Sequence, residues 1–394
     1  MAVPEVFILS AVRSPIGSFA GALKTVPLAE LATTVVREAI SRSGIRADQV
    51  EHLVMGNVIP TEPRDAYLSR VAAIKAGIPV GTPAFNVNRL CGSGLQAIVS
   101  AAQTLELGHA DIVIGAGAES MSRSPYLLPA FRWGARMGDS PALDYMLGIL
   151  HDPFHDIHMG VTAENIAAQA DISRLEQDTL AVESHRRASR AIAEGRFDSQ
   201  LVAISVPGRN GPSDFLVDEH VRADASLEKL AAMKPAFAAN GTVTAGNASG
   251  LNDGASALVL ASGKAVHSSN FKPIARLVAY AHAGVEPHLM GLGPIPATRL
   301  ALKRAGLSIS DMAIIECNEA FAAQACAVAR ALEFDPARVN PNGSGISLGH
   351  PVGATGAIIS TKAIHELHRT GGRYALVTLC IGGGQGIAAI FERV

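Results

Sequence analysis

The 394 residues of the chain exceed the size at which one hydrophobic core usually stops growing, so two or three domains are expected. Hydrophobic residues make up 48% of the chain and charged residues 17%, which excludes an intrinsically disordered protein. The 33 Lys and Arg nearly balance the 35 Asp and Glu, the formal net charge is -2, and this balance argues against a nucleic-acid partner.

The N-terminal region predicts neither a secretory signal nor a membrane anchor. Its apolar stretch, residues 6–9, is too short for a signal peptide. No window of the chain reaches the ~18 uninterrupted apolar residues of a transmembrane helix. We therefore expect a soluble, intracellular protein of the cytoplasm that has no membrane partner.

The cysteine pattern predicts no metal site and no disulfide framework. The four cysteines, Cys91, Cys317, Cys326 and Cys380, include no CxxC pair. Each of them could be a reactive thiol or a buried structural cysteine.

The first predicted unit is a helix followed by a strand, over residues 28–57. Apolar residues recur at helical spacing through its first half, and Gly44 and Asp48 follow. The segment then ends in HLVMGN, residues 52–57, which is typical of a buried strand.

A second helix and strand follow Cys91. An apolar stripe predicts a helix over residues 92–105, and the run DIVIGAGAE predicts a strand over residues 111–119. Continuous apolar strands that alternate with helices are typical of βαβ units, with a largely parallel sheet covered on both faces.

Residues 122–251 have a different character, with clustered Pro, Gly, Asp and His. Only the segment 162–194 predicts a strong helix. We interpret this region as a domain inserted into the first half, which comprises residues 1–121 and, where the chain returns, 252–271.

The remaining residues, 272–394, repeat the first half. A helix over 295–305 leads through Gly306 and Asp311 to the strand-like AIIECN. Three pairs of positions lie at nearly constant offsets of 262, 263 and 261: Gly44 and Gly306, Asp48 and Asp311, Asn57 and Asn318. The sequence therefore predicts two duplicated α/β halves that stack into a layered core.

Cys91 lies where small residues lead into the start of the helix over 92–105. The unpaired N–H groups and partial positive charge of a helix start favour a thiolate, so we expect a lowered pKa and a nucleophilic sulfur. Gly92 and Gly94 leave room for a substrate to approach that sulfur. The alternative is a buried structural cysteine.

His350 occupies the position in the second half that Cys91 occupies in the first. It lies in a glycine-rich, non-helical turn before a helix over 353–367, and a strand over 374–380 follows. Such a histidine can present one ring nitrogen to a cavity while the backbone orients the other, or it can simply be bonded within its turn. Pseudo-symmetric halves would bring Cys91 and His350 to one face, and a Cys–His pair can activate a thiol.

Cys380 and Asn318 each end a predicted strand. Cys380 enters a glycine run, Gly382–Gly384, whose N–H groups could face a developing oxyanion or could form an ordinary tight loop. Asn318 could cap the following helix, or it could hold a water or a carbonyl oxygen. The sequence alone leaves these alternatives open.

Five strings resemble the signatures of the thiolase family, in the family's order, and the resemblance covers essentially the whole chain. They are NRLCGSGLQA, AGNASGLNDGA, NEAFAAQ, ISLGHPVGATGA and CIGGGQG. Within the family the chain is most similar to bacterial β-ketothiolases that supply 3-ketoacyl-CoA for polyhydroxyalkanoate synthesis, through EPRDAYLSRVAA and RWGARMGDS.

The resemblance implies an α/β fold of two duplicated halves in a layered αβαβα core with an inserted loop domain. It also implies that Cys91 is the acylated nucleophile, that His350 activates it, and that Cys380 is the acid and base at the substrate α-carbon. Asn318, through a water, and His350 would polarise one thioester oxygen. The N–H groups of Cys91 and Gly382 would form a second oxyanion hole.

The family binds coenzyme A along the inserted region. Apolar groups would line the pantetheine channel, Ser249 would be a hydrogen-bonding anchor, and Arg222 would lie near the nucleotide. Met159 and Phe237 could instead be core residues, and Arg222 a solvated charge. The matching positions are Leu150, His158, Met159, Arg222, Phe237, Ala245 and Ser249.

The implied reaction is a reversible Claisen condensation of acetyl-CoA with an acyl-CoA, or CoA-dependent thiolysis of a 3-ketoacyl-CoA, by a ping-pong mechanism. The implied partners are acetyl-CoA, acyl-CoA, CoA and further copies of the chain, as a tetramer rather than a dimer. No metal or redox cofactor is needed.

Three alternatives compete with this interpretation, and the residues present argue against the last two. One is a degradative 3-ketoacyl-CoA thiolase of fatty-acid β-oxidation. A decarboxylating ketoacyl synthase on the same fold would be expected to carry a second histidine in place of Cys380. A non-catalytic acyl-CoA-binding protein would be expected to lack Cys91, His350 or Cys380.

Overall fold

A large mixed sheet forms the centre of the fold, in a computed structural model that describes residues 4–208 and 211–394. Its strand order is β14-β15-β16-β13-β1-β12-β5-β3-β4, and β2 pairs with β12. The strands are β1 (Val6–Arg13), β2 (Gly17–Ser18), β3 (His52–Gly56), β4 (Ala84–Val87), β5 (Ile112–Ser120), β12 (Asn252–Ser262), β13 (Ala275–Gly284), β14 (Met312–Cys317), β15 (Tyr374–Ile381) and β16 (Gln385–Arg393).

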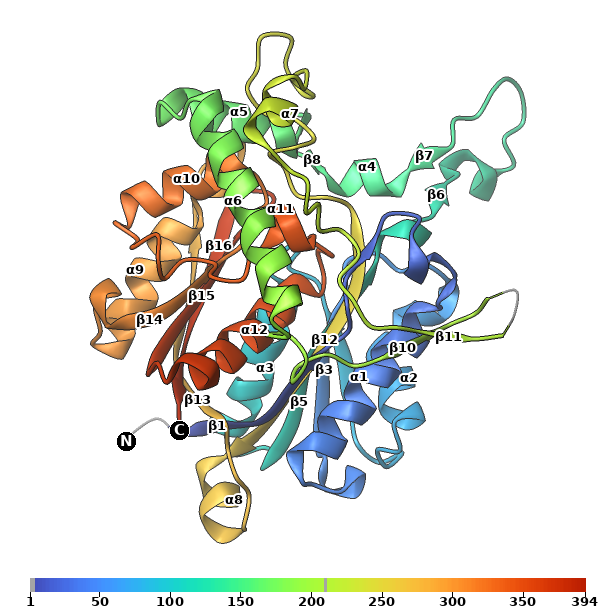
Figure 1. Cartoon of the computed structure of the whole chain (residues 1–394). Helices are drawn as coiled ribbons and strands as arrows, with labels where there is room; N and C mark the ends of the chain where they lie inside the picture. Colours follow the sequence, from blue (N-terminus) through green and yellow to red (C-terminus); the bar gives the residue numbers. More distant parts are fainter. Residues whose placement is uncertain (1–3, 209–210) are drawn as a thin grey trace.

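Helices from both halves of the chain flank this sheet (Figure 1). They are α1 (Leu28–Ser43), α2 (Leu68–Lys75), α3 (Ser93–Glu106), α8 (Gly263–Ser268), α9 (Pro294–Ala305), α10 (Ala322–Ala331), α11 (Gly345–Leu348) and α12 (Thr355–Thr370). Short 3-10 helices are η1 (Ala22–Thr25), η2 (Ala47–Gln49), η3 (Pro63–Tyr67), η4 (Met121–Arg123), η5 (Pro129–Trp133), η6 (Pro287–Leu292) and η7 (Ile309–Asp311).

The segment between β5 and β12 contributes no strand to the large sheet in the part of the chain that the structure describes. Its helices are α4 (Tyr145–Ile149), α5 (Met159–Gln169), α6 (Arg174–Ala193) and α7 (Leu227–Ala231). Its strands form small hairpins: β6 (Tyr126–Leu127) with β7 (Leu143–Asp144), β8 (His151–Asp152) with β9 (Ile157–His158), and β10 (Ile204–Val206) with β11 (Ser213–Phe215).

The two halves repeat the same order of elements and the same strand pairing. The elements α1, β3, α3, β5 and β12 correspond to α9, β14, α12, β15 and β16. Gly56 lies opposite Gly117 in the parallel pair β3–β5, and Cys317 lies opposite Thr378 in the pair β14–β15. Both positions differ by 261 residues (317 − 56 and 378 − 117), which confirms the predicted duplication.

The sequence match of Asp48 with Asp311 is one residue out of register. Asp311 Oδ2 accepts the backbone N–H of Ser308 at 2.8 Å in the turn before β14. In the first half, Gln49 Oε1 accepts the backbone N–H of Arg46 at 2.9 Å. Gln49 is therefore the structural counterpart of Asp311, because both side chains close the same turn.

The elements stack in five layers. The helices α3 and α12 pack against each other in the middle, between the two halves of the sheet (Figure 1). The helices α1 and α2 cover the outer face of the first half, and α9 and α10 cover that of the second. The order helix, sheet, helix, sheet, helix confirms the predicted αβαβα core.

The prediction of a largely parallel sheet is wrong. Among the described residues, the parallel pairs of the large sheet are β3–β4, β3–β5 and β14–β15, whereas the pairs that involve β1, β12, β13 or β16 are antiparallel. A continuous apolar run shows only that a strand is buried on both faces. The central helix layer buries these strands whichever way they run.

The predicted helix over 162–194 is two helices, α5 and α6. Asp171 has a φ of +50°, a left-handed conformation that a continuous helix does not allow. Ser173 then caps α6 in a reciprocal arrangement with Glu176. The Ser-x-x-Glu spacing of this capping box is visible in the sequence and marks the second start.

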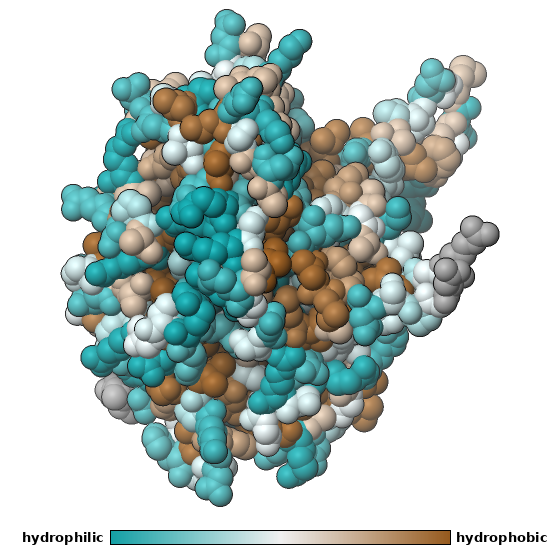
Figure 2. Space-filling view, in the orientation of Figure 1, coloured by the Kyte–Doolittle hydropathy of each residue, from teal (hydrophilic) through white to brown (hydrophobic). Residues whose placement is uncertain are grey.

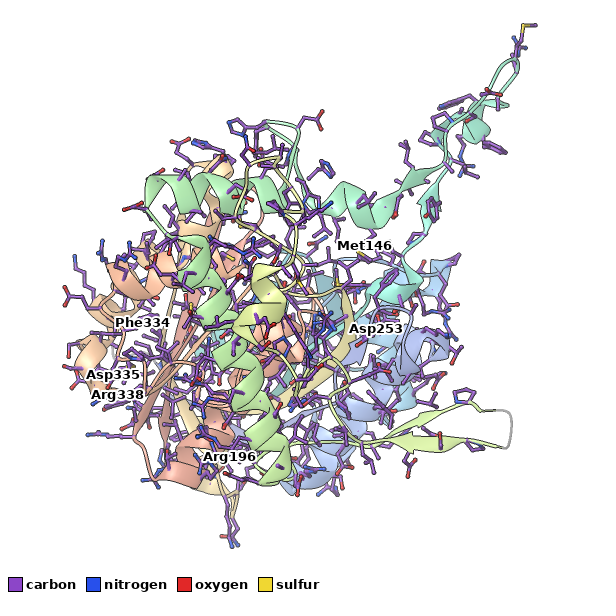
Figure 3. All side chains as sticks on the ribbon, turned by 45° about the horizontal axis from the view of Figure 1, so that its top comes forward. Met146, Arg196, Asp253, Phe334, Asp335 and Arg338 are labelled. Carbon is purple, nitrogen blue, oxygen red and sulfur yellow. The ribbon has the colours of Figure 1, made fainter. Side chains whose placement is uncertain are left out.

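Residues 126–144, here named the arm, project from the body of the molecule in Figures 1 and 3. The arm contains β6, η5 and β7. Several of its large apolar side chains are exposed: Tyr126, Leu127, Phe131, Trp133, Met137 and Leu143. None of the helices in residues 4–208 and 211–394 is long and apolar enough to span a membrane.

Candidate active site

One cavity of about 400 Å³ collects nearly all the residues that the sequence singles out. Asn318 lies beside this lining, where its side chain contacts His350. The duplicated halves and the inserted segment therefore meet at a single site. The lining includes Cys91, His350, Cys380, Gly382, Leu150, His158, Met159, Arg222, Phe237, Ala245 and Ser249.

Cys91 is held in a tight turn just before α3. Leu90 has a φ of +45°, which a branched side chain adopts only when its surroundings enforce it. Ser93 enforces it, because its hydroxyl accepts the N–H of Arg89 at 2.8 Å and donates to the carbonyl of Leu90 at 2.6 Å. The turn places the Cys91 sulfur at the cavity, directly before Gly92, the N-cap of α3.

The prediction that Gly92 and Gly94 clear a path for substrate is wrong. A Cβ atom on Gly92 would lie 2.6 Å from the Ile381 side chain, and one on Gly94 would lie 2.6 Å from the backbone nitrogen of Ala357. Both glycines therefore allow α3 to pack closely against β15 and α12, which fixes where Cys91 sits.

The expected lowering of the Cys91 pKa does not occur in this structure. Burial raises the pKa of the Cys91 thiol to about 11, and the negative charge of Glu119 adds to the rise. The backbone N–H groups of Gly382 and of Cys91 itself act in the opposite direction, but burial outweighs them. Cys91 is therefore a thiol at neutral pH and needs a base.

His350 has the properties of that base. Burial lowers the pKa of its imidazole to about 4, so the ring is neutral at physiological pH. Its Nδ1 lies 2.7 Å from Thr355 Oγ1, and that hydroxyl donates to the carbonyl of Pro351 at 2.9 Å. Because the hydroxyl has only one proton, Nδ1 must donate, which leaves the lone pair of Nε2 free.

Asn318 contacts His350 rather than capping a helix. It directly follows β14, whereas α10 begins four residues later at Ala322 with Phe321 as its N-cap. Its Nδ2 lies 3.4 Å from each ring nitrogen of His350. Its buried Oδ1 has no hydrogen-bond partner in the described residues, so it can accept a hydrogen bond from a water or a substrate group.

Cys380 is fully buried near the end of β15. Burial raises its pKa well above the ordinary value, and negative charge on Cys91 or Cys317 raises it further. Gly383 and Gly384, in the loop that follows Cys380, have φ of +80° and +85°. This left-handed backbone turns the chain back so that β16 can begin. The turn directly follows Gly382, which lines the cavity together with Cys91.

Aromatic rings from three segments form one wall of the cavity. The ring of His158 stacks on Phe237 with centroids 4.8 Å apart, and Phe237 meets Phe321 edge to face at 6.2 Å. His158 Nδ1 also accepts the N–H of Gly160 at 3.0 Å and so caps α5. A Cβ on Gly160 would collide with the Phe237 ring, so the glycine makes the stack possible.

The other predicted CoA contacts differ in burial. Met159 is buried and packs in the same apolar cluster as Cys380, so it is both a core residue and a lining residue. The carbonyl of Leu150 accepts the N–H of Met159 at 2.7 Å. The backbone N–H of Ser249 donates to Ala320 at 3.0 Å. Arg222 makes no ion pair within the described residues, and both Arg222 and Ala245 are exposed where they line the cavity.

The lining also contains residues that the sequence did not single out, His220, Phe321, Met290, Met121, Leu147 and Val352 among them. Burial, with the nearby Arg222 charge, lowers the pKa of His220 to about 4. A Cβ on Gly250, within the string AGNASGLNDGA, would collide with the His220 ring. No periodicity in the sequence points to His220.

The described residues include no group of three or more His, Cys, Asp or Glu side chains placed to hold a metal ion. The polar groups at the cavity include the thiols of Cys91 and Cys380, the imidazole of His350 and, beside the lining, the amide of Asn318.

Comparison with known proteins identifies the family. The patterns of the thiolase N-terminal and C-terminal domains match residues 6–264 and 271–393. The chain is 63% identical over 391 residues to the beta-ketothiolase BktB of Cupriavidus necator, and the match covers 99% of each chain.

Solved structures give the same result. The chain is similar to the structure of the acetyl-CoA acetyltransferase of Bacillus anthracis, with a TM-score of 0.98, 46% identity and 100% of each chain covered. It is also similar to human mitochondrial 3-ketoacyl-CoA thiolase in complex with CoA, with a TM-score of 0.97, 42% identity and 100% and 98% of the two chains covered. The chain is an acyltransferase enzyme that belongs to the thiolase family.

Proposed function

We propose that this enzyme is a β-ketothiolase that condenses acetyl-CoA with an acyl-CoA, or cleaves a 3-ketoacyl-CoA with CoA, through an acyl group carried on Cys91. The observation that carries the proposal is the cavity that holds Cys91, a neutral His350 and Cys380 together. The 63% identity to a beta-ketothiolase over 391 residues supports the substrate class.

In the first half-reaction, Nε2 of His350 takes the Cys91 proton and the thiolate attacks the thioester carbonyl carbon. The N–H groups of Cys91 and Gly382 stabilise the oxyanion. Cys380 donates its proton to the departing CoA sulfur and is left as a thiolate. The products are acyl-Cys91 and CoA, with the proton from Cys91 held on His350.

In the second half-reaction, the Cys380 thiolate removes a proton from the α-carbon of acetyl-CoA. The protonated His350 and the amide of Asn318, with a bound water, stabilise the enolate oxygen. The enolate attacks acyl-Cys91, the carbon–sulfur bond breaks, and the Cys91 sulfur takes its proton back from His350. The raised pKa of Cys380 suits this step, because a thiol that is a weak acid gives a thiolate that is a strong base.

Coenzyme A fits the remaining wall of the cavity. The stacked rings of His158 and Phe237, with Met159 and Leu150, offer an apolar channel for pantetheine. Ser249 lines the same channel, and Arg222 at its exposed mouth can pair with a phosphate. The human relative with the same fold was solved in complex with CoA, which supports this placement.

The physiological role that we propose is the supply of 3-ketoacyl-CoA for polyhydroxyalkanoate synthesis in the cytoplasm. Rates of thiolysis over 3-ketoacyl-CoA substrates of increasing chain length test it. A preference for the shortest chains supports the synthetic role. A preference that grows with chain length would favour the degradative thiolase instead.

The covalent mechanism has its own test. When the enzyme is incubated with acetyl-CoA and the reaction is then stopped, mass spectrometry should find the acetyl group on the peptide that contains Cys91. Double-reciprocal plots of the initial rates over both substrates should be parallel. An acetyl group on Cys317, Cys326 or Cys380 alone, or intersecting lines, would contradict the mechanism.

We also propose that the enzyme is a homotetramer. The arm exposes Phe131, Trp133 and Met137 far from any core of its own chain, and Figure 2 shows further hydrophobic residues at its root. In addition, β4 pairs within the described chain only with β3, so its other edge is free to pair with a second copy. Two separate surfaces of this kind are what a dimer of dimers requires.

A further inference from the structure

We propose that Glu119 is a positioning residue for the acyl-transfer reaction: it joins the loop after β3 to the turn after His350 and thereby aligns the two halves of the site. The proposal rests on the proposed roles of Cys91 and His350. Glu119 lies in β5, is 0% exposed, and belongs to none of the thiolase-like strings of the sequence.

The carboxylate of Glu119 accepts four N–H donors from two segments. Oε1 accepts the side-chain amide of Asn57 and the backbone of Ile59, each at 3.0 Å. Oε2 accepts the backbone of Val58 at 3.0 Å and that of Gly353 at 2.8 Å. A Cβ on Gly353 would collide with Oε2, so only glycine lets this turn reach the carboxylate.

The two segments that Glu119 joins form walls around Cys91. Val58 and Ile59 come from the loop after β3, and Val352 comes from the turn between His350 and α12. All three side chains belong to the buried apolar cluster against which Cys91 packs. A movement of either segment would therefore shift the pocket in which an acyl group on Cys91 must sit.

The duplication gives this arrangement a clear origin. The offset of 261 residues between the sheets of the two halves relates Asn57 to Asn318 and Glu119 to Cys380. In the second half these positions hold an amide next to His350 and the proposed base. In the first half the same two positions bond to each other and to the backbone, so they serve geometry rather than proton transfer.

Glu119 also acts on Cys91 through its charge. Burial raises the pKa of Glu119 to about 8, Asp253 on the neighbouring strand adds to the rise, and the backbone donors oppose it. A negative charge on Glu119 in turn raises the pKa of Cys91. Substitution of Glu119 should therefore change the reactivity of the Cys91 thiol, whereas substitution of a purely structural residue should not.

The test is the Glu119→Gln variant of the full-length enzyme. The amide nitrogen of Gln would face two N–H donors, so two of the four hydrogen bonds are lost while size and shape are kept. We expect kcat for thiolysis to fall about ten- to hundredfold, with KM for CoA changed by less than about threefold. Alkylation of Cys91 by iodoacetamide at about pH 9, above the pKa of Glu119, should become faster, because the neighbouring negative charge is gone.

Asp253→Asn is the matched control. Asp253 is a second buried carboxylate on β12 (labelled in Figure 3), and its Oδ1 accepts the N–H of Ser122 at 2.9 Å. It makes no hydrogen bond to residues 57–59 or to Gly353 in the described chain. Thiolysis by this variant should stay within about threefold of wild type. A fall equal to that of Glu119→Gln would show that any buried charge suffices and would overturn the proposal.

Glu119→Asp keeps the test decisive if the Gln variant does not fold. It retains the charge but shortens the side chain, so kcat should fall while the alkylation rate of Cys91 stays near that of wild type. Wild-type kcat in either Glu119 variant would overturn the proposal. Acetylation of wild-type Cys91 is measured in parallel, and its absence would reject the proposed function itself rather than the role of Glu119.

Discussion

A half-buried cysteine and a buried histidine, whose pKa values shift in opposite directions, face the same cavity. Burial raises the pKa of the Cys91 thiol to about 11 and lowers that of the His350 imidazole to about 4. Both shifts favour the neutral form, because burial penalises charge. The free enzyme therefore holds a thiol beside an uncharged base, and the ion pair forms only when a substrate thioester supplies an electrophile and fixed N–H groups stabilise the developing charge.

This arrangement predicts the pH dependence of Cys91 alkylation in the free enzyme. Because the thiolate is the reactive form and the pKa of Cys91 is raised to about 11, the rate with iodoacetamide should be below that of free cysteine at neutral pH. The rate should keep rising as the pH passes the ordinary pKa of a thiol. Peptide mapping isolates the Cys91 signal. A rate that levels off below the pKa of free cysteine would show that the helix start, and not burial, controls the thiol.

The two cysteines of the site should be separable by role. Acylation of Cys91 involves no α-proton, and a CoA sulfur can depart as a thiolate without the proton that Cys380 gives it, so Cys380→Ser should still become acetylated and exchange labelled CoA with acetyl-CoA. Condensation and thiolysis should fall by about 10²-fold or more, because a serine hydroxyl is seldom ionised near neutral pH. Cys91→Ala should lose all of these activities. Loss of exchange in Cys380→Ser as complete as its loss of thiolysis would mean that Cys380 is also required for acylation.

At the scale of elements, the crossing of α3 and α12 sets the geometry of the site. The first helix begins two residues after Cys91 and the second begins five residues after His350, so the contact between the helices fixes the distance between the two groups. Gly94 and Gly356 allow this contact, since a Cβ on either would press into the backbone of the other helix.

Gly94→Ala tests the importance of this crossing. The new Cβ would lie 2.6 Å from the backbone nitrogen of Ala357, so the helices must separate and we expect a loss of about 1–3 kcal/mol in the free energy of unfolding. Thiolysis should fall as well, because the separation moves Cys91 relative to His350. Urea unfolding measures the first effect and steady-state kinetics the second.

Gly81→Ala is the control for this substitution. A Cβ on Gly81 has no heavy atom within 4 Å, so stability should change by less than about 0.5 kcal/mol. Equal effects of the two substitutions would show that the helix crossing tolerates an added methyl group.

At the scale of the whole molecule, the arm is the feature that a single chain does not explain. It extends away from the five layers (Figure 1), and its Trp133 and Met137 side chains are 85% and 98% exposed. An isolated chain gains nothing from exposing such side chains to water, whereas an assembly can bury them.

A variant with Phe131, Trp133 and Met137 all changed to Ser should lose the tetramer. Light scattering after size exclusion should give about four times the chain mass of 40.8 kDa for wild type and about twice that mass for the variant, since the β4 edge is unchanged. Leu107→Ser replaces an exposed apolar residue directly after α3 and should leave the mass unchanged. A triple variant that remains a tetramer would exclude the arm as an interface.

The sequence by itself determined the duplicated halves, most of their helices and strands and, through its resemblance to thiolases, half of the residues that line the cavity. It could do so because the helix and strand periodicities are local, and because glycine-rich strings such as the one around His350 mark turns where side chains face a cavity. Only the tertiary structure decided the direction of the strands, since burial on both faces leaves the same apolar pattern in parallel and antiparallel strands. Only the tertiary structure decided the protonation state of Cys91 and the place of Glu119, because desolvation and hydrogen bonds between residues 57–59, 119 and 353 depend on which distant segments meet in space.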